Sequence, residues 1–112
     1  MPHQTLQLDR VFRALGDPTR LAVIERLGRG QATASELAKP FAMALPSFTQ
    51  HLNVLEDCGL VTSAKTGRAR TYEINRKHLA AATTWLEAQR QMWTTRLDQL
   101  DAFLIATKDK TP

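Results

Sequence analysis

The stretch LPSFTQHLNVLEDCGLV at residues 45–61 contains the strongest structural pattern in this sequence. Phe48, Leu52 and Leu55 recur at the i, i+4, i+7 spacing that places apolar side chains on one face of a helix. Gly59 follows this stripe, and glycine often ends a helix because it tolerates the left-handed backbone conformation. The stretch therefore predicts a helix that buries one face and ends near Gly59.

The opposite face of this predicted helix carries short, uncharged side chains that can form hydrogen bonds. With the rotation of a helix, Gln50 and Asn53 lie nearly opposite the apolar stripe, with Ser47 and Thr49 on its two flanks. A side-chain amide can pair with adenine N6 and N7, and a hydroxyl can bond a base edge or a phosphate. On an arbitrary small protein these residues would be an ordinary solvated surface. The elements around the helix favour contact with DNA instead.

Elements on both sides of this helix complete a helix-turn-helix and a hairpin. Upstream, Thr33 and Glu36 have the spacing of a capping box, which starts a short helix before a turn. Downstream, residues 60–75 read as two strands around Thr66-Gly67. The predicted fold class is therefore mainly α (α+β), a winged helix-turn-helix with its helix-turn-helix at about 33–58 and a two-stranded wing at about 60–75.

Further helices are predicted at both ends of the chain. Apolar spacing predicts a first helix over about residues 5–15, and Asp17-Pro18 supplies the cap and the first-turn proline of a second helix. No residue breaks the helical pattern of the last helix, from 77 to about 106. About thirty residues span roughly 45 Å, more than the diameter of a small domain. Part of its apolar stripe therefore needs another partner.

Positive charge gathers in the predicted hairpin. The chain has 15 Lys and Arg residues against 11 Asp and Glu residues, which favours an anionic partner. No acidic residue lies between Asp57 and Glu73, whereas Lys65, Arg68 and Arg70 do. We expect these three side chains to contact phosphates or the minor groove of DNA. Their alternative role is to keep the edge of a hairpin soluble.

Three motifs in the chain belong together. They are FRALGDPTRL at residues 12–21, the stretch at residues 45–61 and GRARTY at residues 67–72. In this order and at this separation they resemble the ArsR/SmtB family of bacterial transcriptional repressors, and the similarity spans about residues 8–80. One departure is Ala44, where the family often has a serine that caps the recognition helix.

The resemblance implies a homodimer joined through the first and last helices, with each recognition helix in successive major grooves of an imperfect inverted repeat. It maps the DNA-binding positions of the family onto Ser47, Thr49, Gln50 and His51, whereas helical geometry alone favours Gln50 and Asn53. The expected function is that of a sequence-specific transcriptional repressor whose partner is double-stranded DNA. The expected dimer-interface residues are Leu8, Val11, Leu86, Trp93, Leu97, Leu100 and Leu104.

No metal, cofactor or catalytic site is predicted. Cys58 is the one cysteine and cannot supply the several soft ligands that a thiophilic metal needs, and the histidines are too dispersed to chelate within one chain. A site shared between two chains could still bring His3 near the last helix of a partner. An enzyme would need a nucleophile with a base, paired carboxylates or a phosphate-binding glycine loop, and none occurs at a usable spacing.

The composition predicts a cytoplasmic protein of one domain. A length of 112 residues fits a single domain over residues 1–112. One cysteine, with no signal-peptide pattern at the start, favours a reducing compartment. No apolar run approaches the roughly 20 residues of a membrane span.

Two other functions stay open from the sequence. The helix face and the hairpin can serve a winged-helix module that binds another protein without DNA. Alternatively, Trp85, Met92 and Trp93 can line an apolar effector site at the dimer interface of a small-molecule-responsive repressor. Such side chains more often pack a core or an interface. An unknown effector is thus a further possible partner.

Overall fold

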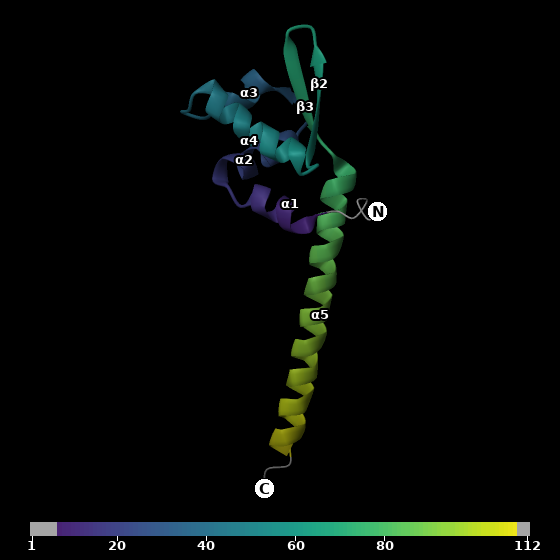
Figure 1. The fold of residues 1–112 in the computed structure, drawn as a ribbon. Coiled ribbons are helices and arrows are strands. Elements are labelled where there is room, and N and C mark those ends of the chain that lie inside the picture. Colours follow the sequence, from purple (N-terminus) through teal and green to yellow (C-terminus); the bar gives the residue numbers. More distant parts are fainter. Residues whose placement is uncertain (1–6, 110–112) are drawn as a thin grey trace. The chain divides into compact units, whose positions relative to one another are not determined.

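A computed structural model describes residues 7–109 as five helices and three strands (Figure 1). Each helix that the sequence predicted is present. The predicted start of the first helix, near residue 5, lies outside the described residues. In chain order the elements are α1 Leu8–Leu15, α2 Pro18–Leu27, β1 Ala32–Thr33, α3 Ala34–Ala38, α4 Leu45–Asp57, β2 Val61–Thr66, β3 Ala69–Ile74 and α5 Arg76–Asp109.

The chain divides into two compact units, one that ends at Ala81 and one that begins at Ala82. The first unit holds helices α1 to α4, the sheet and the start of α5, and the second holds the rest of this 34-residue helix. A lone helix has no core of its own, so one domain over residues 1–112 stays a prediction.

The sheet has three strands rather than the two that the sequence predicted. In the order β1-β3-β2, β1 pairs antiparallel with β3 through Ala32 opposite Tyr72 and Thr33 opposite Thr71. Thr33 is also the N-cap of α3, and its extended backbone, with φ of −79° and ψ of 162°, is what both roles require. A strand of two residues is too short for a period-2 pattern, which is why the sequence did not predict β1.

The predicted capping box is confirmed. The Glu36 backbone N–H donates to Thr33 Oγ1 over 3.1 Å, and the Thr33 backbone N–H donates to Glu36 Oε1 over 2.8 Å. At α4, by contrast, Ala44 is the N-cap and provides no side-chain hydrogen bond, because a methyl group cannot accept one. Pro46 lies in the first turn of α4, where its missing N–H leaves no orphan donor.

The core of the first unit corrects one predicted interface residue. Val11 has no exposed surface, because the Val11 and Ala14 face of α1 is buried within the chain, where α1 contacts α2 and α4. The assignment of Val11 to the dimer interface is therefore wrong, whereas Leu8 is half-buried. The core side chains of this unit are Val11, Ala14, Val23, Ile24, Leu27, Ala32, Leu37, Phe48, Leu52, Leu55, Leu60, Val61 and Tyr72.

Gly59 ends α4, as the sequence predicted. Its φ is +87°, and the N–H groups of Gly59 and Leu60 donate to the carbonyls of Glu56 and Leu55, each over 3.0 Å. These two bonds form a Schellman motif, which satisfies carbonyls that the helix itself leaves free. The motif directs the chain from α4 straight into β2, so the helix and the wing are joined by a rigid corner.

Candidate nucleic-acid interface

Helix α4 has one buried and one open face, as its sequence pattern predicted. Phe48, Leu52 and Leu55 have no exposed surface, and the Phe48 ring packs against Phe41 with centroids 5.3 Å apart. This anchoring fixes the rotation of the helix about its axis. Of the predicted DNA-contacting side chains on α4, Ser47, Gln50 and Asn53 are exposed, and Thr49 and His51 are half-buried.

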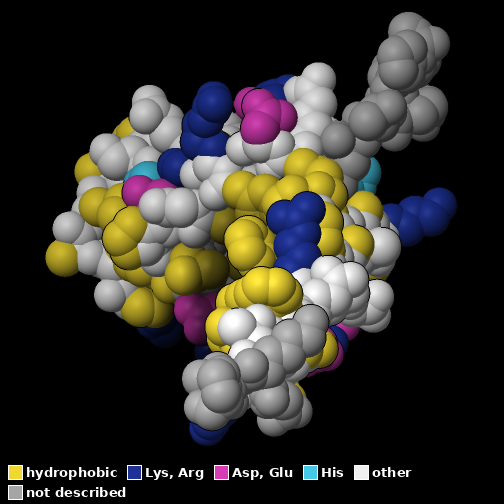
Figure 2. Space-filling model, turned by 90° about the horizontal axis from the view of Figure 1, so that it is seen from below, with side chains coloured by type: hydrophobic (Ala, Val, Ile, Leu, Met, Phe, Trp, Pro, Cys, Tyr) yellow, Lys and Arg dark blue, Asp and Glu magenta, His cyan; other side chains and the backbone are white. Residues whose placement is uncertain are grey.

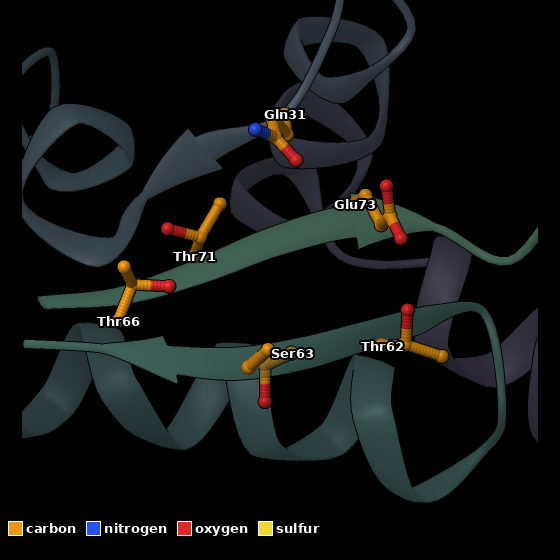
Figure 3. A pocket seen from close by; sticks show the side chains of 7 residues that line it. Gln31, Thr62, Ser63, Thr66, Thr71 and Glu73 are labelled. Atoms are coloured by element: carbon orange, nitrogen blue, oxygen red, sulfur yellow. The ribbon is translucent and has the colours of Figure 1, made fainter.

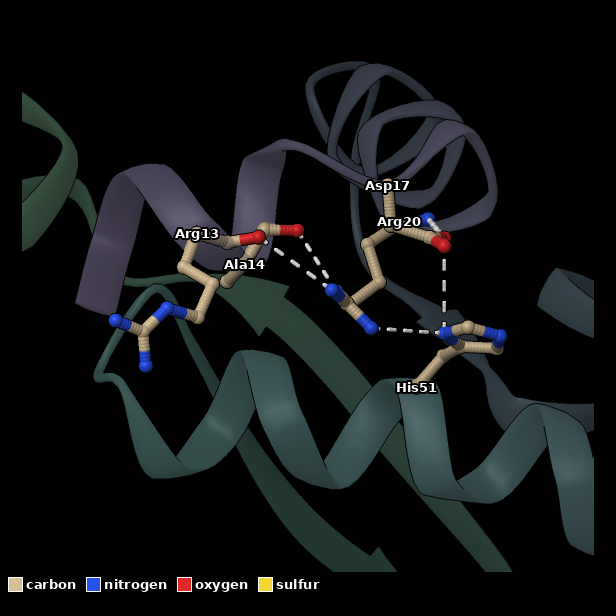
Figure 4. Close-up of polar contacts among 5 residues, drawn as sticks. All are labelled: Arg13, Ala14, Asp17, Arg20 and His51. Atoms are coloured by element: carbon tan, nitrogen blue, oxygen red, sulfur yellow. Dashed lines mark hydrogen bonds and ion pairs between the residues drawn. The ribbon is translucent and has the colours of Figure 1, made fainter. Parts of the chain in front are cut away.

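His51 is bound to residues of the α1–α2 corner (Figure 4). Its Nδ1 atom lies 3.1 Å from Arg20 Nη1 and 3.6 Å from Asp17 Oδ2. Only the first distance is that of a hydrogen bond. Nδ1 can therefore accept from Arg20 in the tautomer that carries its proton on Nε2. Figure 4 shows the Nε2 side of the ring turned away from both partners, so this N–H can donate to a ligand.

The Arg20 side chain ties α4 to α1. Its Nε donates to the Ala14 carbonyl over 2.7 Å and its Nη2 to the Arg13 carbonyl over 3.4 Å (Figure 4). These carbonyls belong to the last turn of α1, where helix carbonyls lack i+4 donors, and the Arg13 carbonyl also accepts from the Gly16 backbone N–H over 3.1 Å. One guanidinium therefore caps α1 and holds His51 of α4 at the same time. No role of Arg20 was predictable from the sequence, because a pairing across 31 positions leaves no local pattern.

We expect Asp17→Ala to lower the free energy of unfolding by about 1 kcal/mol at neutral pH, because α2 loses its N-cap. The Arg20 backbone N–H, 3.1 Å from Asp17 Oδ2, is the main cause that holds the pKa of Asp17 below its ordinary value. The contribution is thus present above the ordinary carboxyl pKa and is lost as pH falls through the lowered one. Urea unfolding at neutral and at strongly acidic pH measures this. If the free energies of unfolding of parent and variant differ by the same amount at both pH values, the pH-dependent contribution of Asp17 is contradicted.

The wing brings its basic residues together at its tip. Gly67, with φ of +65°, and Arg68 form the turn between β2 and β3. Lys65 and Arg70 are direct cross-strand partners, and all three basic side chains are exposed. Like charges directly opposite each other destabilise a hairpin. An anion beside the pair removes this repulsion.

A chain of hydrogen bonds connects the wing to α4. Arg70 Nη1 donates to Ser63 Oγ over 2.8 Å, and Ser63 Oγ donates to Glu56 Oε2 over 2.8 Å. Arg70, predicted to contact phosphate, therefore also has an internal partner. Ser63 and Glu56 were not predicted from the sequence. The one signal for Ser63 is its place opposite the buried Tyr72 in the hairpin.

A pocket of about 170 Å³ lies on the face of the sheet opposite to the one on which the Ser63 side chain bonds Glu56 of α4 (Figure 3). Figure 3 shows the Ser63 hydroxyl pointing away from the side chain of Thr62. The pocket wall contains the Glu73 carboxylate and no Lys or Arg, so it is a poor site for a phosphate. Its lining residues are Gln31, Thr62, Ser63, Ala64, Thr66, Thr71 and Glu73.

Within residues 7–109, no three His, Cys, Asp or Glu side chains gather in a way that could hold a metal ion. Cys58 is half-exposed, and its thiol donates to the Leu55 carbonyl over 3.3 Å. His3, for which a shared site was considered, lies outside the described residues. The absence of a metal and of a cofactor stays a prediction. None of the described helices is long and apolar enough to cross a membrane.

Helix α5 exposes a continuous apolar stripe beyond Ala82. Five predicted interface residues lie within about 60° of one another around the helix axis. Each is between 50% and 58% exposed. Viewed from below (Figure 2), hydrophobic side chains form connected areas at the surface. Phe103, at 65%, is even more exposed and was not predicted. The five predicted residues are Leu86, Trp93, Leu97, Leu100 and Leu104.

The chain is similar to known regulators in sequence. A family model described as a helix-turn-helix domain matches residues 15–64. The HTH-type transcriptional regulator Rv2034 of Mycobacterium tuberculosis is 38% identical over 89 residues, which cover 80% of each chain. The transcriptional repressor SdpR of Bacillus subtilis is 30% identical over 79 residues, which cover 70% of this chain and 88% of the repressor.

Solved structures agree with this similarity. The crystal structure of the ArsR family transcriptional regulator RHA00566 has a TM-score of 0.74 and 52% identity, and the match covers 79% of this chain and 97% of that one. The homodimeric winged helix-turn-helix DNA-binding domain Mb0332 of Mycobacterium bovis has a TM-score of 0.60 and 25% identity, covering 77% and 82%.

Proposed function

Because the chain belongs to the ArsR/SmtB family of winged helix-turn-helix transcriptional regulators, we propose that it is a repressor that binds an inverted-repeat operator as a homodimer. Its family consists of DNA-binding regulators, which are not enzymes, and we expect no catalytic activity. A role on genomic DNA also places the protein in the cytoplasm.

Helix α4 is the proposed reader of the base sequence. Gln50 and Asn53 present amides on its open face, where either can make a bidentate contact with adenine that discriminates by about 1–3 kcal/mol. Ser47 and Thr49 lie on the flanks of that face and can bond base edges or phosphates. The Nε2–H group of His51 can donate to a phosphate or base acceptor while Arg20 holds Nδ1.

The observation that carries the proposal is the coupling of this open face to the basic wing. The bonds from Arg70 through Ser63 to Glu56 fix the wing against α4. Lys65, beside Arg70, and Arg68 at the turn can then reach phosphates or the minor groove while α4 lies in the major groove.

The apolar stripe of α5 supports the homodimer. Exposed Leu and Trp side chains along one face of a helix need a partner, and a second copy supplies an identical stripe. A two-fold dimer places its recognition helices about 34–36 Å apart, one turn of DNA, which matches an inverted repeat. A protein-binding module that uses the same α4 face and wing is not favoured, because the similar proteins are named as transcriptional regulators and one solved neighbour as a DNA-binding domain. An effector site near Trp85 and Met92 is not favoured either, because it gives the open face of α4 and the basic wing no role.

We expect Gln50→Ala to relax the preference at one base-pair position by about 1–3 kcal/mol and to leave the salt dependence unchanged, because an amide contact to a base releases no counterions. The contrasting variant, Arg68→Ala with Arg70→Ala, should weaken binding to every sequence and flatten the salt dependence by about 0.9 per lost phosphate contact. Titrations of operator duplexes with single substitutions, at several salt concentrations, measure both. Equal salt slopes for wing variant and parent contradict the role of the wing.

A further inference from the structure

Three arginines meet in a pocket of about 290 Å³ between α1 and the C-terminal half of α4. Arg10 and Arg13 come from α1, and Arg20 comes from α2. From α4 the pocket wall includes Val54, Asp57 and Cys58, so one acidic residue and three arginines line the pocket.

Two of these arginines are available to a ligand. Arg20 is already committed to the carbonyls of α1 and to His51. Among residues 7–109, Arg10 donates from Nη1 to a neutral group, the Gln7 side-chain oxygen, over 3.2 Å. The Arg13 guanidinium is turned away from Arg20, over the C-terminal part of α4 (Figure 4). Both side chains are exposed, so the pocket is open to a large anion.

The pocket lies on the flank of α4 that the wing does not cover. Val54 and Cys58 line the pocket, and Glu56, which bonds the wing, projects about 160° away from each of them around the helix axis. A helix in the major groove has a phosphodiester strand on each side. The wing can serve one strand, and the pocket faces the other.

We propose that Arg10 and Arg13 bind a backbone phosphate of the operator on the flank of α4 opposite the wing. This inference rests on the proposed function, because it requires α4 to enter the groove. The proposed phosphate site is compatible with the dimer, because Leu8, the α1 residue expected at the interface, lies about 160° from Arg10 around the helix axis. Arg20 positions α4, and Asp57 is the acidic residue in the lining of the pocket.

The test is operator binding by Arg10→Gln with Arg13→Gln, measured between about 0.05 and 0.5 M salt. Each phosphate contact contributes about 0.9 to the logarithmic salt slope, so the double variant should flatten the slope by up to about 1.8. At 0.1 M salt its affinity should fall on the order of 60-fold, equally for the operator and for random duplex. A variant with Arg10→Gln and Arg13→Lys keeps the charge at position 13 and should regain one phosphate contact relative to the double Gln variant.

Arg29→Gln is the matched control, because Arg29 is an exposed arginine on the α2–α3 side of the unit, away from this pocket. It changes the net charge by the same amount per substitution and should leave the slope unchanged. If the parent selects its operator and the double variant has the same salt slope as the parent, the proposed phosphate site is wrong. A parent that shows no preference for any duplex refutes the proposed function first.

Inorganic phosphate without DNA tests the other source of the same chemistry. We expect no saturable binding below about 1 mM, because a free ion lacks the flanking contacts of a DNA strand. The contrary result is that the parent binds phosphate saturably, the double variant does not, and both have the same salt slope for operator binding. That result would mean that the site binds a free anion and not a DNA phosphate. Thermal unfolding by circular dichroism confirms that each variant is folded.

Discussion

Leu97→Asp combined with Leu100→Asp is expected to convert the proposed dimer into a folded monomer and to weaken operator binding by about 10²- to 10⁴-fold. Both leucines lie on the exposed stripe of α5, where a carboxylate would be buried against the partner without a counter-charge. Affinity falls because the second half-site is no longer bound within one complex, which removes the gain from effective concentration. The core of the first unit contains neither residue and should stay folded.

The matched control for the dimer variant is Thr95→Asp. Thr95 is exposed on the opposite side of α5, about 180° from Leu86 and Leu104 around the helix axis. It should remain dimeric and bind the operator as the parent does. Sedimentation at micromolar concentration gives the oligomeric state, and operator titration gives the affinity. If the double-aspartate variant stays dimeric, α5 does not form the dimer interface.

The second large effect is expected for Gly59→Ala, which should lower the free energy of unfolding by about 2–5 kcal/mol. Two causes add up. A residue with a Cβ atom is strained at the φ of +87° that ends α4. The new methyl would also lie 2.5 Å from Cδ2 and 2.6 Å from Nε2 of the His78 ring, at the start of α5. Urea unfolding of parent and variant measures the difference.

Two further variants separate the causes. Gly67→Ala, at φ of +65° with no atom within 4 Å of the new Cβ, has only the conformational cost, about 1–2 kcal/mol. Adding His78→Ala to Gly59→Ala should recover the steric part, so the double variant should be more stable than Gly59→Ala alone. If His78→Ala instead destabilises both backgrounds equally, the close approach of Gly59 to His78 is not the cause.

The sequence predicted those parts of the fold that depend on local periodicity. The buried side of α4 follows from the spacing of Phe48, Leu52 and Leu55, and the start of α3 follows from the capping box of Thr33 and Glu36. Both signals lie within a few residues, so no knowledge of the tertiary structure was needed.

The parts that the sequence did not predict depend on distant residues or on which element covers a face. Val11 was assigned to the dimer because periodicity marks an apolar face without saying whether the chain itself or a partner covers it. The contact of His51 with Arg20 and the Arg70–Ser63–Glu56 chain join side chains that only the folded chain brings together. For this reason the candidate residues of α4 were predictable, but the residues that position them were not.

Selection of bound DNA from a pool of random duplexes tests the central claim, that α4 and the wing read operator DNA, most directly. We predict enrichment of one inverted repeat whose half-sites are centred about 10–10.5 base pairs apart. The purified full chain should bind this repeat more tightly than random competitor at the same salt concentration. A pool that stays unenriched, with the selected and random duplexes bound equally, would contradict the account.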